Sequence, residues 1–265
     1  NETPMEHRYA TLGMKPRGGL CLFLAMAVNG LCAQVAQYVF SQSNGTWTEL
    51  ITQDGGYDLG TPTTAYSRVY VDPAVPAGAP SQSYVQPVSG PGLPIGFDFA
   101  YNGEQFDRIG ISSQGWISFG KSVDGANAVS VYGADGGAAP LSTAFHNPTP
   151  SYKRNRVAGF GAMGLRAQDR TLQDGFASSL RMATIGTAPN RVCVVQWKDF
   201  RRTFDWNQDR ITFQVRLHET SNVVEVSYGP MQWGASSVSP EVGVGGTSSA
   251  DHNNRRTVYQ QPTFR

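Results

Sequence analysis

The chain has 265 residues, of which 40% are hydrophobic and 15% charged, and its formal net charge is +1. That balance excludes a broad electrostatic attraction for nucleic acid or anionic lipid, since both need clustered lysine and arginine. The 30 glycines and 16 prolines make the chain rich in turns and disfavour helical bundles and coiled coils. The length suits one large β domain with short appendages.

The first 33 residues have the pattern of an upstream segment followed by a secretory signal peptide. Met14, Lys15 and Arg17 form a basic start, Leu20–Val28 is apolar, and Ala33 is a small residue at the expected cleavage point. The apolar run is shorter than the ~20 residues that span a bilayer, so the sequence predicts no stable membrane insertion after cleavage. We therefore expect a secreted protein that acts outside the cell or at its surface.

With cleavage expected after residue 33, the chain is predicted to have three parts. Residues 1–33 are removed, residues 34–256 form the predicted β module, and residues 257–265 begin a linker or a truncated continuation. The module keeps a single cysteine, Cys193, so its fold rests on core burial rather than on internal disulfides. Because Cys193 lies in an apolar run, we expect it to be buried and inert.

The start of the module shows alternating β-type runs. Gln37–Ser41 and Thr46–Ile51 alternate on either side of a Ser-Asn-Gly turn, which predicts a hairpin. Residues 72–94 contain six prolines. Because proline lacks a backbone donor, the sequence predicts an irregular, exposed stretch there.

A three-stranded meander is predicted next. The runs Ile95–Tyr101 and Phe106–Ser112 flank Asn102-Gly103, a pair suited to the positive backbone angles of a tight hairpin. Trp116–Gly120 follows a Ser-Gln-Gly turn and completes the meander, with Trp116 as a core residue. Residues 121–153 are rich in small residues and predict a long surface loop.

The remaining strands are short and separated by glycine, proline and asparagine. They are predicted at Val157–Leu165, Ser179–Ile185, Val192–Phe200, Ile211–Leu217, Val224–Tyr228 and Glu241–Gly246. About ten short strands without helical periodicity predict an all-β fold, an antiparallel β-sandwich with jelly-roll-like topology.

Catalytic motifs are missing from the sequence. It has no zinc-binding histidine pair, no Gly-x-Ser-x-Gly and no phosphate-binding glycine loop. Glu219 and Glu225 flank one predicted turn, and two acids a short distance apart would suit a glycoside hydrolase. Acids at strand ends usually face solvent, so we favour a protein that is not an enzyme, with glycoside hydrolysis as the main alternative.

Two sets of residues are candidate binding sites. Asp205, Asn207 and Asp209 alternate in one loop and offer oxygen ligands to calcium, although an ordinary polar turn explains the same pattern. We expect no other cofactor. Trp206 and Trp233, near turns, could stack on sugar rings or pack against the edge of the sandwich.

Several ordered blocks resemble the N-terminal β module of large secreted Bacteroidota proteins, of the type exported by type IX secretion. The blocks are Tyr38–Thr48, Pro94–Gly103, Ser113–Gly120, Gly186–Arg191 with Gln196-Trp197, Phe213–Glu219 and Gly243–Asn254. A weaker similarity links Gly115–Gly120, Phe213–Leu217 and Val226–Gly229 to the extracellular nidogen-like domain, an adhesion-associated module. Neither resemblance supplies a catalytic motif.

The sequence therefore predicts a non-catalytic interaction or structural module, of adhesion type, in a longer extracellular protein. Its expected partners are extracellular protein or glycan. We expect specificity to lie in residues 121–153, 201–209 and 230–240, which two packed sheets would hold in place. The alternative is a glycan-binding or glycan-cleaving β-sandwich.

Overall fold

A computed structural model of the chain describes residues 34–60, 69–74, 87–132, 140–142, 155–161, 165–167, 169–202, 209–232, 234 and 240–256. These residues all belong to one unit, residues 33–265, and the other unit, residues 1–32, lies outside them. No helix in the described part of the chain has the length and apolarity needed to cross a membrane.

The first sheet is antiparallel and is built mainly from consecutive strands. Its order is β1 (Tyr57–Gly60), β12 (Ser179–Ile185), β13 (Val192–Arg202), β14 (Ile211–His218) and β15 (Val224–Tyr228). The short strand β9 (Leu165–Arg166) pairs with the end of β13. Along β14, Phe213, Val215 and Leu217 belong to the main core, as their alternation predicts.

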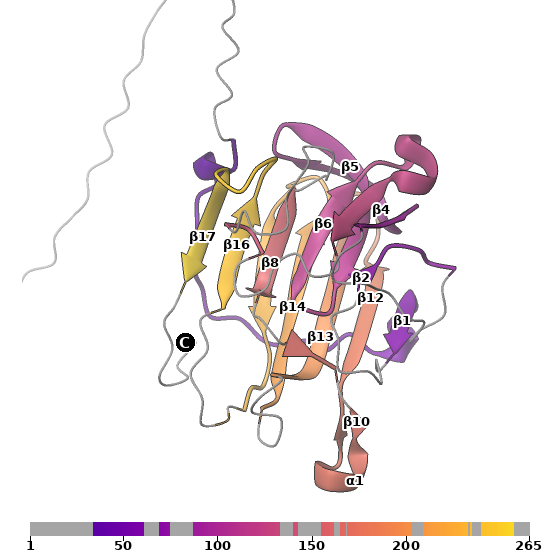
Figure 1. The fold of residues 1–265 in the computed structure, drawn as a ribbon, viewed down its shortest axis with the longest axis vertical. Helices are drawn as coiled ribbons and strands as arrows, with labels where there is room; N and C mark the ends of the chain where they lie inside the picture. The colour runs from indigo at the N-terminus through magenta and orange to yellow at the C-terminus, as the bar shows by residue number, and fades with distance from the viewer. Residues whose placement is uncertain are drawn as a thin grey trace, which may run out of the picture. The chain divides into compact units, whose positions relative to one another are not determined.

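The second sheet packs against the first. Its order is β17 (His252–Arg256), β16 (Glu241–Gly245), β8 (Arg156–Gly161), β6 (Trp116–Gly120), β5 (Glu104–Ser112) and β2 (Val69–Tyr70), with β4 (Leu93–Tyr101) also paired to β5. Figure 1 shows these strands in front of β12, β13 and β14. The predicted antiparallel sandwich is confirmed, with several short strands beyond the ten or so expected.

Aromatic side chains fill the space between the two sheets. Trp197 of β13 stacks on Phe213 of β14, with ring centroids 4.8 Å apart. Phe160 of β8 reaches Phe213 from the opposite sheet at 5.9 Å. The indole Nε1 of Trp197 donates a hydrogen bond of 3.0 Å to the carbonyl oxygen of Ser112 on β5. The polar atom that this tryptophan buries in the core therefore has a hydrogen-bond partner.

A further layer covers the outer face of the second sheet. Strand β3 (Pro87–Gly90) pairs with β7 (Val129–Tyr132), which follows the short helix η3 (Ser122–Asn127). Trp116, Val129 and Leu141 share a second hydrophobic cluster beneath this layer. Two predictions are therefore wrong in part: residues 87–90 and 93–94 form strands, and residues 121–153 include a strand. The apolar residues of β7 are buried because they pack against Trp116, which β6 presents on its outer face.

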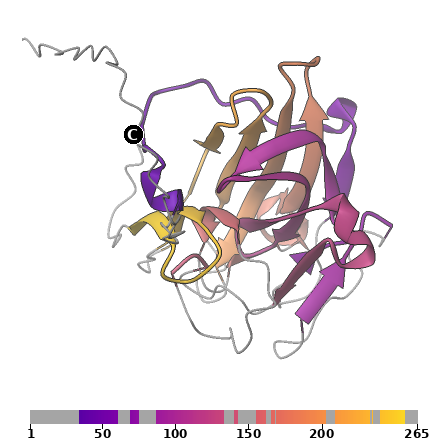
Figure 2. The same cartoon turned by 90° about the horizontal axis from the view of Figure 1, so that it is seen from above.

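The predicted hairpin at Gln37–Ser41 and Thr46–Ile51 is also wrong. Residues 38–51, here called the N-terminal strap, form no strand and run between the short helices η1 (Gln34–Gln37) and η2 (Thr52–Asp54). Figure 2 shows this indigo segment running along the orange strands of the first sheet.

The strap is bonded to the sheet through glutamine side chains. Gln196 accepts from the Leu50 backbone N–H at 2.8 Å and donates to the Leu50 carbonyl at 3.0 Å. Gln214 Nε2 donates to Gln196 Oε1 at 2.8 Å and to the Thr48 carbonyl at 2.9 Å. These distant partners satisfy the backbone that a local hairpin would otherwise pair.

The other predicted strands are confirmed to within a few residues. Asn102 and Gly103 have positive φ angles of 50° and 77° at the β4–β5 turn, as a tight hairpin requires. Cys193 is fully buried in β13, and burial raises the pKa of its thiol to about 12, which keeps it protonated.

Candidate binding groove

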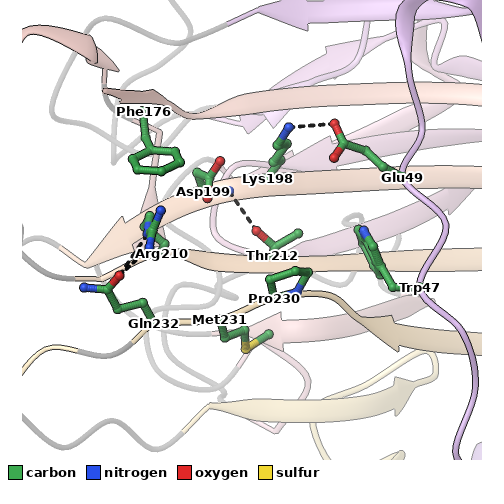
Figure 3. A pocket seen from close by; sticks show the side chains of 10 residues that line it. All are labelled: Trp47, Glu49, Phe176, Lys198, Asp199, Arg210, Thr212, Pro230, Met231 and Gln232. Carbon is green, nitrogen blue, oxygen red and sulfur yellow. Dashed lines mark hydrogen bonds and ion pairs between the residues drawn. The ribbon is translucent and has the colours of Figure 1, made fainter. Parts of the chain in front are cut away.

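A groove lies on the outer face of the first sheet, near the end of β13 and β14. It has a volume of about 470 Å³ and is lined by Trp47, Glu49, Phe176, Lys198, Asp199, Arg210, Thr212, Pro230, Met231 and Gln232. Figure 3 shows Phe176 and Trp47 at opposite ends, with Lys198, Asp199 and Thr212 between them. The groove therefore joins the strap, the sheet and the segment around Phe176.

A β-bulge in β13 places two charged side chains in this groove. Trp197 pairs with Phe213 and Phe200 pairs with Ile211, so the register shifts by one residue between them. Trp197 and Phe200 both face the core, and strict alternation would turn Asp199 inward. The extra residue instead leaves Lys198 and Asp199 beside each other in the groove lining.

The backbone of Asp199 is held in an uncommon conformation. Its φ is 53°, a left-handed value that aspartate tolerates better than most side chains. The Asp199 N–H donates to Thr212 Oγ1 at 3.1 Å, and Ser178 Oγ donates to the Asp199 carbonyl at 2.5 Å. Such locked outliers are commonly found at binding and catalytic sites.

The Asp199 carboxylate makes no hydrogen bond or ion pair within the described residues. Burial raises the pKa of this carboxyl above its ordinary value, against the opposite effect of the positive charges on Lys198, Arg210 and Arg201. A half-buried carboxylate without a bonding partner is therefore available to accept hydrogen bonds from a ligand.

The other charged groups of the groove already have partners. Lys198 Nζ lies 2.6 Å from Glu49 Oε1. Arg210 donates to Gln232 Oε1 at 2.5 Å and 3.1 Å, and its guanidinium lies over the Phe176 ring at 3.9 Å from the centroid. These contacts fix the direction of the Phe176 side chain, which stays 40% exposed.

Trp47 is held flat against the sheet by a glycine. A Cβ built on Gly229 would stand 2.7 Å from Trp47 Cε2 and 2.9 Å from Cδ2, the two carbons shared by the indole rings. One face of the indole therefore rests on Gly229, at a distance that needs a residue without a side chain. The strap thus supplies one aromatic end of the groove.

Buried arginines tie the segment that carries Phe176 to the end of the sheet. Phe176 belongs to β11 (Phe176–Ala177), which pairs with β10 (Asp169–Arg170) around the helical turn α1 (Thr171–Asp174). Arg201, fully buried, contacts Asp174 at 2.8 Å and donates to the Asp209 carbonyl at 3.0 Å. These contacts hold the β10–α1–β11 segment, and with it Phe176, against the end of the first sheet.

Of the binding residues that the sequence predicted, the structure describes only Asp209. Trp206, Trp233, Asp205 and Asn207 lie outside the described residues. Asp209 is buried, and its carboxylate accepts hydrogen bonds from Arg202 Nη2 at 2.7 Å and from the Gly234 N–H at 2.6 Å. Asp209 thus has a structural task, and the calcium site remains a prediction. Within the described residues, no three His, Cys, Asp or Glu side chains group to hold a metal.

The two glutamates considered for catalysis are held by separate basic residues. Arg191 donates to Glu219 at 2.5 Å and 2.8 Å, and this lowers the pKa of the Glu219 carboxyl to about 2. His218 lies 2.7 Å from Glu225 and lowers the pKa of that carboxyl. Neither glutamate lines the groove.

Sequence reasoning missed Trp47, Phe176 and Asp199 as site residues. One signal for Asp199 is present in the sequence: Cys193, Val195 and Trp197 alternate, but the next large apolar residue is Phe200 rather than residue 199. A break of one residue in this period predicts a bulge, and bulges redirect side chains.

Comparison with known proteins identifies one family. The family model described as NIDO related matches residues 37–264, nearly the whole predicted module. No curated protein matches the chain, and neither does a solved structure.

Proposed function

Because the chain belongs to the NIDO-related family, we propose that it is a secreted, non-catalytic interaction module that binds an extracellular partner through the groove on its first sheet. The family suggests a module of extracellular type, and the groove is the surface through which we expect it to bind a partner. A predicted signal peptide over residues 14–33 supports export.

The groove is the observation that carries this proposal. It combines exposed aromatic surface at Phe176 with a carboxylate, Asp199, that has no bonding partner among the described residues. Its neighbours Lys198 and Arg210 are held by Glu49 and Gln232. A site built this way offers fixed contacts to a ligand, as binding sites on rigid scaffolds do.

The alternative of a glycan-cleaving module has one observation in its favour. Glu49 and Asp199 line the same groove, and glycoside hydrolysis needs two carboxylates. Glu49 is already engaged in an ion pair with Lys198 at 2.6 Å, so Asp199 is the one of these two carboxylates that is left to act on a glycosidic bond. Binding without cleavage therefore has the better support.

The test is binding of the purified chain to immobilised extracellular matrix proteins and oligosaccharides. We expect at least one ligand to be retained by the native chain and lost by both Trp47→Ala and Phe176→Ala. Val123→Ala, at a position that is 88% exposed and outside the groove, serves as the control. Binding that survives both groove substitutions, or no binding at all, contradicts the proposal. Release of cleaved products that stops in Asp199→Asn would make the protein an enzyme instead.

We further propose that the module belongs to a longer cell-surface or secreted Bacteroidota protein of the type IX cargo kind. The support is the resemblance carried by the ordered sequence blocks, including Pro94–Gly103 and Phe213–Glu219. Secretion of the chain by a strain with an intact type IX system, and its retention in a strain without that system, would test this route. Equal secretion by both strains would overturn it.

A further inference from the structure

We propose that the ligand of the groove is a neutral sugar chain, with the Asp199 carboxylate accepting hydrogen bonds from ring hydroxyls and Trp47 and Phe176 contacting the faces of sugar rings. This inference rests on the proposed function and narrows its ligand to one chemical class. Three features support it: the lack of hydrogen-bond donors to the Asp199 carboxylate among the described residues, the charges around that carboxylate, and the aromatic rings of Trp47 and Phe176.

The Asp199 carboxylate has no hydrogen-bond donor among the described residues. A half-buried carboxylate has lost part of its hydration, and protein donors within the described residues do not replace it. A ligand that brings hydroxyl groups satisfies this acceptor with charge-assisted hydrogen bonds. Two neighbouring hydroxyls on one ring match the two oxygens of a carboxylate.

The charges around Asp199 favour a neutral ligand. Lys198, Arg210 and Arg201 act on Asp199 with positive charge, while Glu49 acts with negative charge. Among the residues that line the groove, two acids and two bases balance. A cationic ligand would meet Lys198 and Arg210, and an anionic ligand would meet Asp199 and Glu49. Neutral donors satisfy Asp199 without either repulsion.

Trp47 and Phe176 form the two aromatic ends of the groove. Trp47 lies flat on Gly229, and Phe176 lies against the Arg210 guanidinium, so each ring is fixed before a ligand arrives. Rigid aromatic faces bury the C–H faces of sugar rings at little entropic cost. Figure 3 shows the polar groups between the two rings, an order that suits a chain of several sugar units.

The experiment measures Kd by isothermal titration calorimetry with neutral hexasaccharides of glucose, mannose, xylose and N-acetylglucosamine. Heparin and polygalacturonate serve as anionic probes, and chitosan oligosaccharides as cationic probes. The variants are Asp199→Asn and Asp199→Gly, both compatible with the positive φ of 53° at this position. Asp98→Asn is the matched control, since Asp98 is exposed on β4 and outside the groove.

We expect the native chain and Asp98→Asn to bind at least one neutral hexasaccharide with similar Kd. Both Asp199 variants should bind it about 10-fold more weakly or worse, because a charge-assisted hydrogen bond is lost. Native binding should also weaken as the pH falls through the raised pKa of Asp199.

Three outcomes would overturn the inference. They are binding restricted to charged probes, no binding to any neutral hexasaccharide, and neutral binding that Asp199→Asn leaves unchanged. If a matrix protein is instead bound and then lost in Trp47→Ala and Phe176→Ala, the groove remains a binding site and only the sugar assignment fails.

Discussion

At the scale of single residues, Asp199 illustrates a conflict between folding and binding. Its carboxylate is half buried at a bulge, and burial raises its pKa. A raised carboxyl pKa means that the folded state holds the proton more tightly than the unfolded state does. The charge on Asp199 therefore reduces stability above the folded pKa, and a residue that is unfavourable for folding is commonly kept for function.

We predict that Asp199→Asn raises the melting temperature at pH 7. The gain arises because the neutral amide avoids the cost of burying a charge, and it should shrink as the pH falls through the folded pKa towards the unfolded value of ~3.9. Thermal melts of both proteins at a series of pH values measure this difference. Any gain that remains at low pH reports the better tolerance of asparagine for positive φ. A difference that grows towards low pH would contradict the assignment.

Gly229 gives a second prediction at this scale. Gly229→Ala places a methyl group about where the Trp47 indole lies, 2.7 Å from Cε2, and we expect it to push Trp47 off the sheet. Acrylamide quenching of tryptophan fluorescence should increase, and ligand binding should weaken. Gly45→Ala, where an added Cβ meets nothing within 4 Å, is the control. Unchanged quenching in Gly229→Ala would show that Trp47 does not rest on this glycine.

At the scale of elements, the strap takes the place of a strand without forming one. Its backbone bonds to Gln196 and Gln214, whose amides provide the donor and acceptor that a neighbouring strand would offer. Long-range partners of this kind leave no periodic signal in the strap sequence. That is why the alternation of Gln37–Ser41 and Thr46–Ile51 predicted a hairpin that the structure does not contain.

We predict that Gln196→Ala destabilises the protein by about 1–3 kcal/mol, because Leu50, which is buried, loses partners for both its N–H and its carbonyl. Urea denaturation gives the size of the effect, and hydrogen exchange at the Leu50 amide should become faster. Gln105→Ala, at an exposed position on β5, controls for loss of a glutamine. Equal exchange at Leu50 in both variants would contradict the proposed anchoring.

Other elements were predictable because their signals are local. The Asn102-Gly103 turn and the alternation of Ile211–Leu217 specify a hairpin and a strand with one apolar face without reference to the rest of the chain. The prediction that this strand is only half buried is wrong, since Thr212 and Gln214 on its polar face are buried as well. In contrast, β7 was hidden in a glycine-rich stretch, because its burial depends on Trp116 from another strand. The groove was hidden for the same reason, since Trp47, Phe176 and Asp199 come from three distant segments.

At the scale of the whole molecule, three sheet layers and the strap enclose three hydrophobic clusters in the described part of the chain, and the smallest packs Leu50 of the strap against Ala183 and Val194. The main cluster lies between the large sheets, and the second lies between β6 and the covering strand β7. Trp116 is fully buried in the second cluster, with the Arg156 guanidinium 4.4 Å from its ring centroid. The second cluster therefore fastens the outer layer to the sandwich.

We predict that Trp116→Ala costs about 3–5 kcal/mol of unfolding free energy, since it leaves a large cavity in this cluster. Trp116→Phe should cost much less, because the indole Nε1 has no hydrogen-bond partner to lose among the residues that the structure describes. Denaturant titration of both variants measures the difference. A loss in Trp116→Ala no larger than that in Trp116→Phe would place Trp116 outside the core.

The bonds between the strap and the first sheet also have a mechanical consequence. Tension applied at the N-terminal side of the strap first loads Tyr38, whose carbonyl accepts from Asn253 of β17 and whose hydroxyl accepts from the Asn102 N–H. Once these bonds yield, the tension reaches Trp47, and the glutamine contacts at Thr48 and Leu50 resist it next. Peeling would remove one aromatic wall while the sandwich stays folded. A ligand held between Trp47 and Phe176 would then be released under pulling at a force well below that which unravels the domain.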